Sequence, residues 1–142
     1  MPTRDGHARW EGGLKEGSGT VDTASGALSA NYSASSRFED GSGTNPEELV
    51  GAAHASCFSM ALTNILESAG HQPAYVDTTA KVTVKAADGG FVIPTIELVT
   101  EAKVPGIDDA DFHAHAETAK RECPLSKALA GPEISLQATL TG

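Results

Sequence analysis

The sequence predicts an α+β fold, and three observations support this class. Segments that alternate apolar and polar residues lie near both ends of the chain, one long apolar helical segment follows the first of them, and a strand hairpin precedes a second helix. The chain has 142 residues, of which 39% are hydrophobic. This is enough for a single domain over residues 1–142 with its own core.

Two short antiparallel strands are expected at the start of the chain. Residues 7–15 and 17–23 have the alternation of strands, and glycine supplies the turn between them. Residues 40–44, with the sequence Asp-Gly-Ser-Gly-Thr, have the composition of a flexible loop.

The longest predicted element is a helix over about residues 46–69. Asn45 suits the N-cap, a proline follows at the first helical position, and Glu48 at the third position completes a variant of the capping box. Gly70 is the expected stop. Apolar and small residues surround the whole helix, so we expect it to be buried and central, with Cys57 in its middle.

The second half of the chain reads as a hairpin followed by helices. Residues 75–86 and 91–104 alternate as strands do, and residues 88–90 (Asp-Gly-Gly) form the turn between them. Acidic residues at 108–111 start a second helix, whose apolar stripe ends at Cys123.

Pro124 shapes the end of the chain. It disfavours an α conformation at Cys123 and suits the first position of a short helix over residues 124–130. A last strand is then predicted over residues 134–140.

Composition disfavours several classes of partner. The net charge of −9 argues against nucleic acid or an anionic membrane surface, and the basic residues form no patch. The polar N-terminus has no signal-peptide core, and no stretch is expected to approach the apolar length of a membrane span. A cytoplasmic location is therefore expected.

The two cysteines are the strongest indication of chemistry, because reductants in the cytosol keep structural disulfides open. Burial in mid-helix should make Cys57 a poor nucleophile unless a cation lies beside it. Arg37 could stabilise its thiolate and a developing oxyanion, and Glu47 could hold the guanidinium in a bidentate pair.

Helix geometry adds a hypothesis about assembly. Ten residues along a helix rise about 15 Å, so Glu47 cannot lie beside Cys57 of its own helix. If both belong to one site, a second, antiparallel copy of the helix must supply Glu47, which predicts a two-fold homodimer.

Cys123 precedes a helix start, so a lowered thiol pKa is expected there. With Cys57 as the attacking thiol, Cys123 would be the resolving thiol. The alternative is that both cysteines are small buried hydrophobes in an acidic, non-catalytic stress protein.

A mixed Cys/His zinc site is a further alternative. Its candidate ligands are His54, Cys57, His113, His115 and Cys123, but their spacing matches no common zinc signature. Residues two apart on a helix also face different directions, so solvated histidines and a packed His54 are the simpler interpretation.

Two longer runs resemble a known family. Residues 36–41 and 43–62, which contain Cys57, closely resemble the OsmC family (osmotically inducible protein C), and residues 123–129 resemble its second motif. The run around Cys57 is closer to the OsmC branch than to the organic hydroperoxide resistance (Ohr) proteins, within the OsmC/Ohr superfamily of thiol peroxidases.

The resemblance implies a cysteine-based peroxidase that works as an intertwined homodimer without metal, haem or another cofactor. It implies that Cys57 is the peroxidatic cysteine and Cys123 the resolving one, and that Arg37 and Glu47 match the family's arginine and glutamate. The expected substrates are organic hydroperoxides and also hydrogen peroxide, and the expected reductant is a lipoyl-type dithiol. Three apolar residues would line the substrate site or belong to the core: Phe38, Phe58 and Met60.

Overall fold

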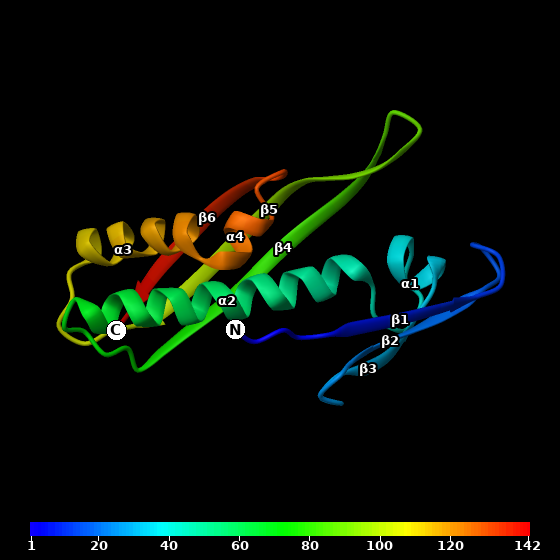
Figure 1. The fold of residues 1–142 in the computed structure, drawn as a ribbon. Coiled ribbons are helices and arrows are strands. Elements are labelled where there is room, and N and C mark those ends of the chain that lie inside the picture. Colours follow the sequence, from blue (N-terminus) through cyan, green and yellow to red (C-terminus); the bar gives the residue numbers. More distant parts are fainter. The chain divides into compact units, whose positions relative to one another are not determined.

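The computed structural model describes all 142 residues, which form two compact units, residues 1–49 and residues 50–142. The elements confirm the predicted α+β class (Figure 1). In chain order they are β1 (Gly6–Glu11), β2 (Ser18–Thr23), β3 (Ser29–Tyr32), α1 (Ala34–Phe38), α2 (Pro46–Ser68), β4 (Tyr75–Ala87), β5 (Gly90–Lys103), α3 (Asp109–Glu122), α4 (Pro124–Ala128) and β6 (Glu133–Thr141).

The first unit contains a three-stranded antiparallel sheet in the order β1-β2-β3. Trp10 of β1 pairs with Gly19 of β2, which in turn pairs with Tyr32 of β3. The rings of Trp10 and Tyr32 lie 5.4 Å apart across Gly19, where a Cβ atom would come within 2.5 Å of the Tyr32 ring. The prediction of a first strand over residues 7–15 is too long, and it omitted β3 and α1.

Helix α2 begins and ends where its capping residues predict. The side chain of Asn45 accepts a hydrogen bond from the Glu48 N–H at 2.7 Å. The carboxylate of Glu48 accepts from the Thr44 hydroxyl at 2.8 Å, so no reciprocal capping box forms. At the other end Gly70 has a φ of 89°, and the His71 N–H donates to the Leu66 carbonyl oxygen, as in a Schellman motif.

One face of α2 is buried and the opposite face is exposed. Four fully buried residues recur at every fourth position: His54, Phe58, Leu62 and Leu66. Met60, on another side, is 76% exposed, so the expectation of burial around the whole helix does not hold within one chain. The cause is that small residues make every side of α2 apolar, whereas the rest of the chain covers only one side of the helix.

The length and composition of α2 correct a further expectation. With 23 residues, and a mean hydropathy of 1.4 over an 18-residue window, the helix is long and apolar enough to cross a membrane, contrary to the expectation that no stretch approaches this length. This is weak support for a membrane span, because the core helix of a globular protein passes the same test. The buried face of α2 packs in a core with residues of β5 and α3.

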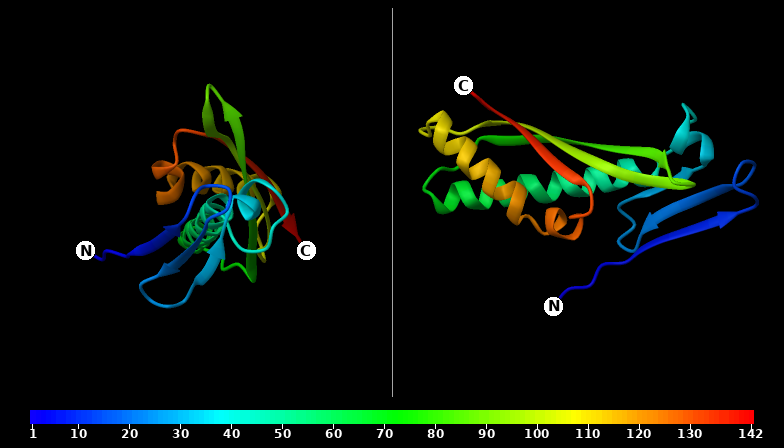
Figure 2. Two further views of the ribbon diagram at one scale, coloured as in Figure 1. Left: turned by 90° about the vertical axis from the view of Figure 1, so that its right-hand side faces the viewer. Right: turned by 90° about the horizontal axis from the view of Figure 1, so that it is seen from above.

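The second unit is a sheet covered on one face by helices. Strands β4 and β5 form a hairpin whose turn residues, Asp88 and Gly89, have φ values of 47° and 79°, as a type I′ turn requires. Strand β6 pairs with β5 in parallel, after the chain has crossed over through α3 and α4. Helices α2 and α3 lie on the same face of this sheet (Figure 1, Figure 2).

Gly51 allows α2 to approach the sheet closely. A Cβ atom at this position would lie 3.0 Å from the carbonyl oxygen of Ala80 in β4. Because that oxygen belongs to backbone, it could not move aside as a flexible side chain can.

His113 fastens α3 to the edge strand β6. Its Nδ1 lies 2.8 Å from the Asp109 carbonyl oxygen and its Nε2 lies 2.9 Å from the Ala138 carbonyl oxygen. Both nitrogens can donate only in the imidazolium form. The hydrogen bond to the Asp109 backbone is the main cause that raises the pKa of His113, burial opposes it, and the Asp109 charge, the Ala138 backbone bond and Glu117 add to the rise.

Replacing His113 with glutamine should therefore lower stability more at about pH 5.5 than at about pH 9. Since the folded-state pKa is raised, the imidazolium stabilises the fold fully below the unfolded pKa of about 6.5, and this contribution is lost as pH rises through the folded pKa. The side chain is 46% exposed, so solvent screening keeps the contribution below about 1 kcal/mol. Urea unfolding at both pH values measures it, with His115→Gln as control. An equal loss at both pH values would contradict the assignment.

Candidate active site

Arg37 and Glu47 are brought together by the segment that joins α1 to α2. The side chain of Ser33 caps α1 in a capping box with Ser36. The hydroxyl of Ser36 also donates to the Thr44 carbonyl oxygen at 2.7 Å, and the amide of Asn45 donates back to the Ser36 carbonyl oxygen at 3.1 Å. The returning chain therefore starts α2 beside α1.

The predicted ion pair between Arg37 and Glu47 is present and bidentate. Nε of Arg37 donates to Oε1 and Oε2 of Glu47 at 3.0 and 3.2 Å, and Nη2 donates to Oε1 at 2.8 Å. The Glu47 side chain is 7% exposed and the Arg37 side chain 37% exposed. The Arg37 guanidinium also lies 5.2 Å from the Phe38 ring centroid. The guanidinium is held in one orientation and keeps a side open to solvent.

Cys57 and Cys123 form the second pair of the candidate site. Both are free thiols, and they lie close enough to interact, because Cys123 raises the pKa of the Cys57 thiol. Cys57 comes from the middle of α2 and is half-buried, whereas Cys123 stands between α3 and α4 and is fully buried. Only Cys57 therefore has surface that a small molecule can reach.

Cys123 caps two helices at once. Its backbone N–H donates to the Ala119 carbonyl oxygen at the end of α3, and its sulfur accepts from the Ser126 N–H at 3.3 Å in the first turn of α4. Its φ and ψ of −61° and 136° are extended, as expected before Pro124. Two caps and the following proline thus fix the direction of the thiol.

The environment of Cys57 disfavours its thiolate. Burial is the main cause that raises the pKa of the Cys57 thiol, and the hydrogen bond and charge interaction with Cys123 raise it further. A hydrogen bond with the Leu125 backbone, in the first turn of α4, acts in the opposite direction and lowers this pKa. Burial therefore acts on this pKa in the direction that the sequence predicts, and a nearby cation would act against it.

The zinc alternative finds no cluster of ligands. No group of three or more His, Cys, Asp or Glu side chains is placed to hold a metal ion. His113 is engaged by two carbonyl oxygens, and His54 is bonded to Ser126. The ion pair and the thiol pair belong to different units, residues 1–49 and residues 50–142.

The three apolar candidates for a substrate site have different surroundings. Phe58 is fully buried in the core, so it cannot line an open site, and the core assignment is the correct one. Met60 is 76% exposed on α2 and Phe38 is 40% exposed beside Arg37. Only these two remain accessible.

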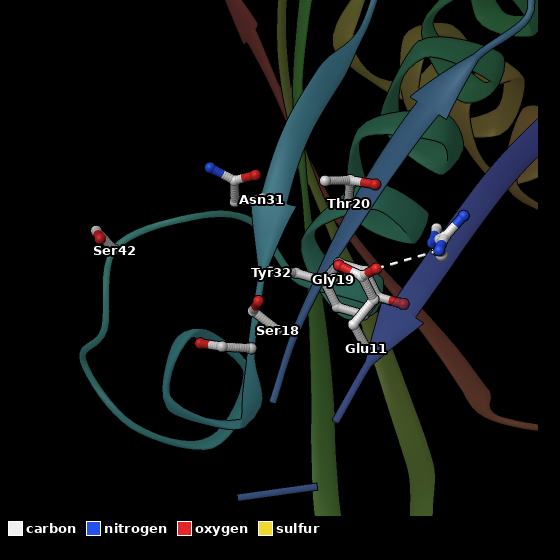
Figure 3. Close-up of a pocket in the computed structure, with 9 residues that line it drawn as sticks. Glu11, Ser18, Gly19, Thr20, Asn31, Tyr32 and Ser42 are labelled. Atoms are coloured by element: carbon white, nitrogen blue, oxygen red, sulfur yellow. Dashed lines mark hydrogen bonds and ion pairs between the residues drawn. The ribbon is translucent and has the colours of Figure 1, made fainter. Parts of the chain in front are cut away.

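A cavity of about 300 Å³ in the first unit contains none of the candidate residues (Figure 3). Its charged residues, Arg9 and Glu11, form an exposed ion pair at 3.1 Å. The remaining lining residues are Ser18, Gly19, Thr20, Asn31, Tyr32, Ser33 and Ser42. No buried charged group faces this cavity, so it offers no competing candidate site.

The sequence interpretation missed the contacts of His54 and Ser126. Nε2 of His54 lies 2.8 Å from the Ser126 hydroxyl oxygen, which lies 3.2 Å from the Cys123 sulfur. The sequence did contain a signal for the contact of Ser126 with Cys123. A cysteine followed by proline, with serine three residues after the cysteine, has the spacing of an N-cap and its N3 partner. The partner on α2 could not be found this way, because 72 residues separate His54 from Ser126.

Known proteins are similar to this chain in sequence and in fold. The family model for the OsmC-like proteins matches residues 39–137. The chain is 50% identical over 134 residues to the peroxiredoxin OsmC of Escherichia coli strain K12, covering 94% of this chain and 93% of the relative. It is 34% identical over 102 residues to the organic hydroperoxide resistance protein of Xanthomonas axonopodis pv. citri, covering 71% and 68%.

Solved structures agree with the fold. The organic hydroperoxide resistance protein OhrB of Bacillus subtilis superposes with a TM-score of 0.75 and 26% identity, covering 98% of both chains. An organic hydroperoxide resistance protein of Elizabethkingia anophelis superposes with a TM-score of 0.70 and 28% identity, covering 100% of this chain and 97% of the other.

Proposed function

The chain belongs to the OsmC family, and we propose that it is a thiol peroxidase that reduces organic hydroperoxides with Cys57 and Cys123. One observation carries the proposal: an accessible thiol and a buried thiol lie close enough in the folded chain for Cys123 to raise the pKa of Cys57. The names of the relatives, a peroxiredoxin and organic hydroperoxide resistance proteins, support a role in peroxide reduction and oxidative stress.

The proposed cycle has three balanced steps. The Cys57 thiolate attacks the O–O bond of the hydroperoxide, giving a sulfenic acid and an alkoxide that takes up a proton to become the alcohol. The Cys123 thiol then condenses with the sulfenic acid, releasing water and forming the Cys57–Cys123 disulfide. A dithiol, of lipoyl type in our proposal, reduces that disulfide by exchange and is itself oxidised to a disulfide.

Arg37 is the cation that the mechanism requires. Its charge would lower the thiol pKa that burial raises, and its free side would bind the developing alkoxide. Glu47 would hold the guanidinium in place through the bidentate pair. Arg37 and Glu47 would therefore act before or during the attack of Cys57 on the hydroperoxide, and neither residue would be consumed.

We further propose that a homodimer assembles this site, with the ion pair supplied by a second copy. Glu47 lies in the first turn of the helix that carries Cys57. The ten residues between these positions separate them by about 15 Å along the helix axis. The exposed side of α2, with Met60 at 76% exposure, is the surface that a second copy would cover. Two equivalent sites would follow.

The substrate preference follows from the apolar surroundings. Phe38 and Met60 are accessible apolar side chains, and they would contact the alkyl part of an organic hydroperoxide. Hydrogen peroxide has no such part, so we expect it to react more slowly. The cytoplasm, where thiols are kept reduced, is the proposed location.

Thiol counting tests the function. Mixing reduced protein with one equivalent of cumene hydroperoxide should remove both thiols of each chain and form an intramolecular disulfide. Cys123→Ser should lose only the Cys57 thiol, at an unchanged initial rate, and its sulfenic acid should be trapped by dimedone. Mass spectrometry identifies each product. A wild-type thiol count that stays unchanged after peroxide addition would refute the proposal.

A further inference from the structure

A buried polar chain leads away from the resolving thiol. The Cys123 sulfur lies 3.2 Å from the Ser126 hydroxyl oxygen, which lies 2.8 Å from Nε2 of His54. His54 and Cys123 are fully buried, and Ser126 is 5% exposed. The two-cysteine cycle uses only the Cys123 sulfur of this hydrogen-bonded series of side chains.

The elements that hold the two thiols also hold His54 and Ser126. His54 lies one helical turn before Cys57 on α2, and Ser126 lies in the first turn of α4, three residues after Cys123. Ser126 contacts the sulfur twice, through its hydroxyl at 3.2 Å and its backbone N–H at 3.3 Å. The donors that a Cys123 thiolate would need are therefore already in place.

The other ring nitrogen of His54 suggests more than a packing role. Nδ1 is buried and has no hydrogen-bond partner. A buried unpaired polar atom is destabilising and calls for an explanation, of which a catalytic role is one. Burial lowers the pKa of His54, so the ring is neutral near pH 7, and an imidazolium formed there would readily give up its proton again.

Resting on the function proposed above, we propose that His54, acting through Ser126, takes up the proton of the Cys123 thiol as the disulfide forms. In the resting chain the thiol donates to the Ser126 hydroxyl and the hydroxyl donates to Nε2 of His54. After transfer both bonds reverse: Nε2–H donates to the Ser126 oxygen, and the Ser126 hydroxyl donates to the Cys123 thiolate.

The step balances in atoms and charge. The Cys123 thiolate attacks the sulfur of the Cys57 sulfenic acid, the S–S bond forms, the S–O bond breaks and hydroxide leaves. The proton held by the His54 imidazolium then neutralises the hydroxide, giving water and neutral His54. The oxidant is the hydroperoxide consumed in the preceding step, so no other co-reactant is needed.

The titratable groups that face the pair of His54 and Ser126 are the two cysteines. Cys57 comes from α2 and Cys123 from the junction of α3 and α4, and burial is the only cause that shifts the pKa of His54. Within one chain, therefore, no carboxylate or cation acts on the imidazole.

The experiment separates the two chemical steps. Reduced protein is mixed with one equivalent of cumene hydroperoxide and quenched at intervals, and mass spectrometry measures the sulfenic acid and disulfide fractions. His54→Gln and Ser126→Ala should form the sulfenic acid within about twofold of the wild-type rate. Disulfide formation should slow by at least about tenfold, so that the sulfenic acid accumulates.

Two further readouts exclude a merely structural role. Glutamine can bond to the Ser126 hydroxyl but cannot hold a proton, so His54→Gln should approach the wild-type rate of disulfide formation only as solvent hydroxide increases toward about pH 9. Ser126→Thr keeps the hydroxyl and should restore most of the rate. The control is His115→Gln, on α3, which should behave as wild type. If His54→Gln does not fold, the rates of disulfide formation in Ser126→Ala and Ser126→Thr still test the proton-transfer role.

The outcomes are distinguishable. Disulfide formation at the wild-type rate in Ser126→Ala, or an equal slowing of both steps, overturns the proton-transfer role. Failure of the wild-type protein to form a sulfenic acid overturns the proposed peroxidase function, and the proton-transfer role with it.

Discussion

Replacing Cys57 with serine is expected to abolish peroxide reduction, lowering the second-order rate constant for cumene hydroperoxide by at least about 10⁴-fold. A serine hydroxyl ionises far less readily than a thiol and cannot form a sulfenic acid. Cys123 cannot take over, because it is fully buried and only Cys57 is accessible. Peroxide consumption with an excess of dihydrolipoamide measures the rate.

The substitution should leave the fold intact, because cysteine and serine differ little in size and Cys57 is only half-buried. The matched control is Ser68→Ala, at the far end of the same helix, where the hydroxyl donates only to the Asn64 carbonyl oxygen. This variant should keep the wild-type rate. A Cys57→Ser protein that still consumed peroxide would move the attacking role to Cys123.

Replacing Arg37 with alanine should reduce the same rate constant by about 100- to 1000-fold, as expected for one lost donor to a developing oxyanion. The variant also loses the charge that offsets the burial of Cys57, so its thiol pKa should rise further. The pH–rate profile should therefore shift to higher pH, and the defect should shrink as pH rises. An unchanged profile would leave Cys57 without its proposed cation.

Two neighbouring variants separate charge from orientation. Arg37→Lys keeps the charge but cannot form the bidentate pair, so it should recover only part of the rate. Glu47→Gln keeps Arg37 but weakens its two-point attachment, so it should lose less than Arg37→Ala. A Glu47→Gln defect as large as that of Arg37→Ala would assign Glu47 a direct role in the reaction.

Mixed dimers test which copy supplies the ion pair. If the site combines Cys57 of one copy with Arg37 of the other, coexpressed Cys57→Ser and Arg37→Ala chains form hybrids with one intact site. With random pairing such a mixture should recover about a quarter of wild-type activity. If each site uses its own chain's residues, no activity returns and the shared site is refuted.

Local signals in the sequence account for most of the element boundaries. Asn45 and Gly70 bound α2 because a cap and a positive φ are properties of single residues. Asp88 and Gly89 give the hairpin turn for the same reason. The ion pair of Arg37 with Glu47 could be anticipated because both lie in one contiguous motif.

The features that were missed depend on contacts distant in sequence. Strand β3 has four residues and little alternation, and it is held by pairing with β2. The alternation in β6 indicates which face is covered, but not that β6 runs parallel to β5. The contact of His54 with Ser126 arises only when α4 packs against α2.

The double cap at Cys123 makes the joint between α3 and α4 intolerant of changes in length. Each added or deleted residue turns the helix by about 100°, so a single insertion there would swing the sulfur away from the other thiol. The length of this joint, more than the surfaces of the two helices, therefore sets whether the two thiols can meet.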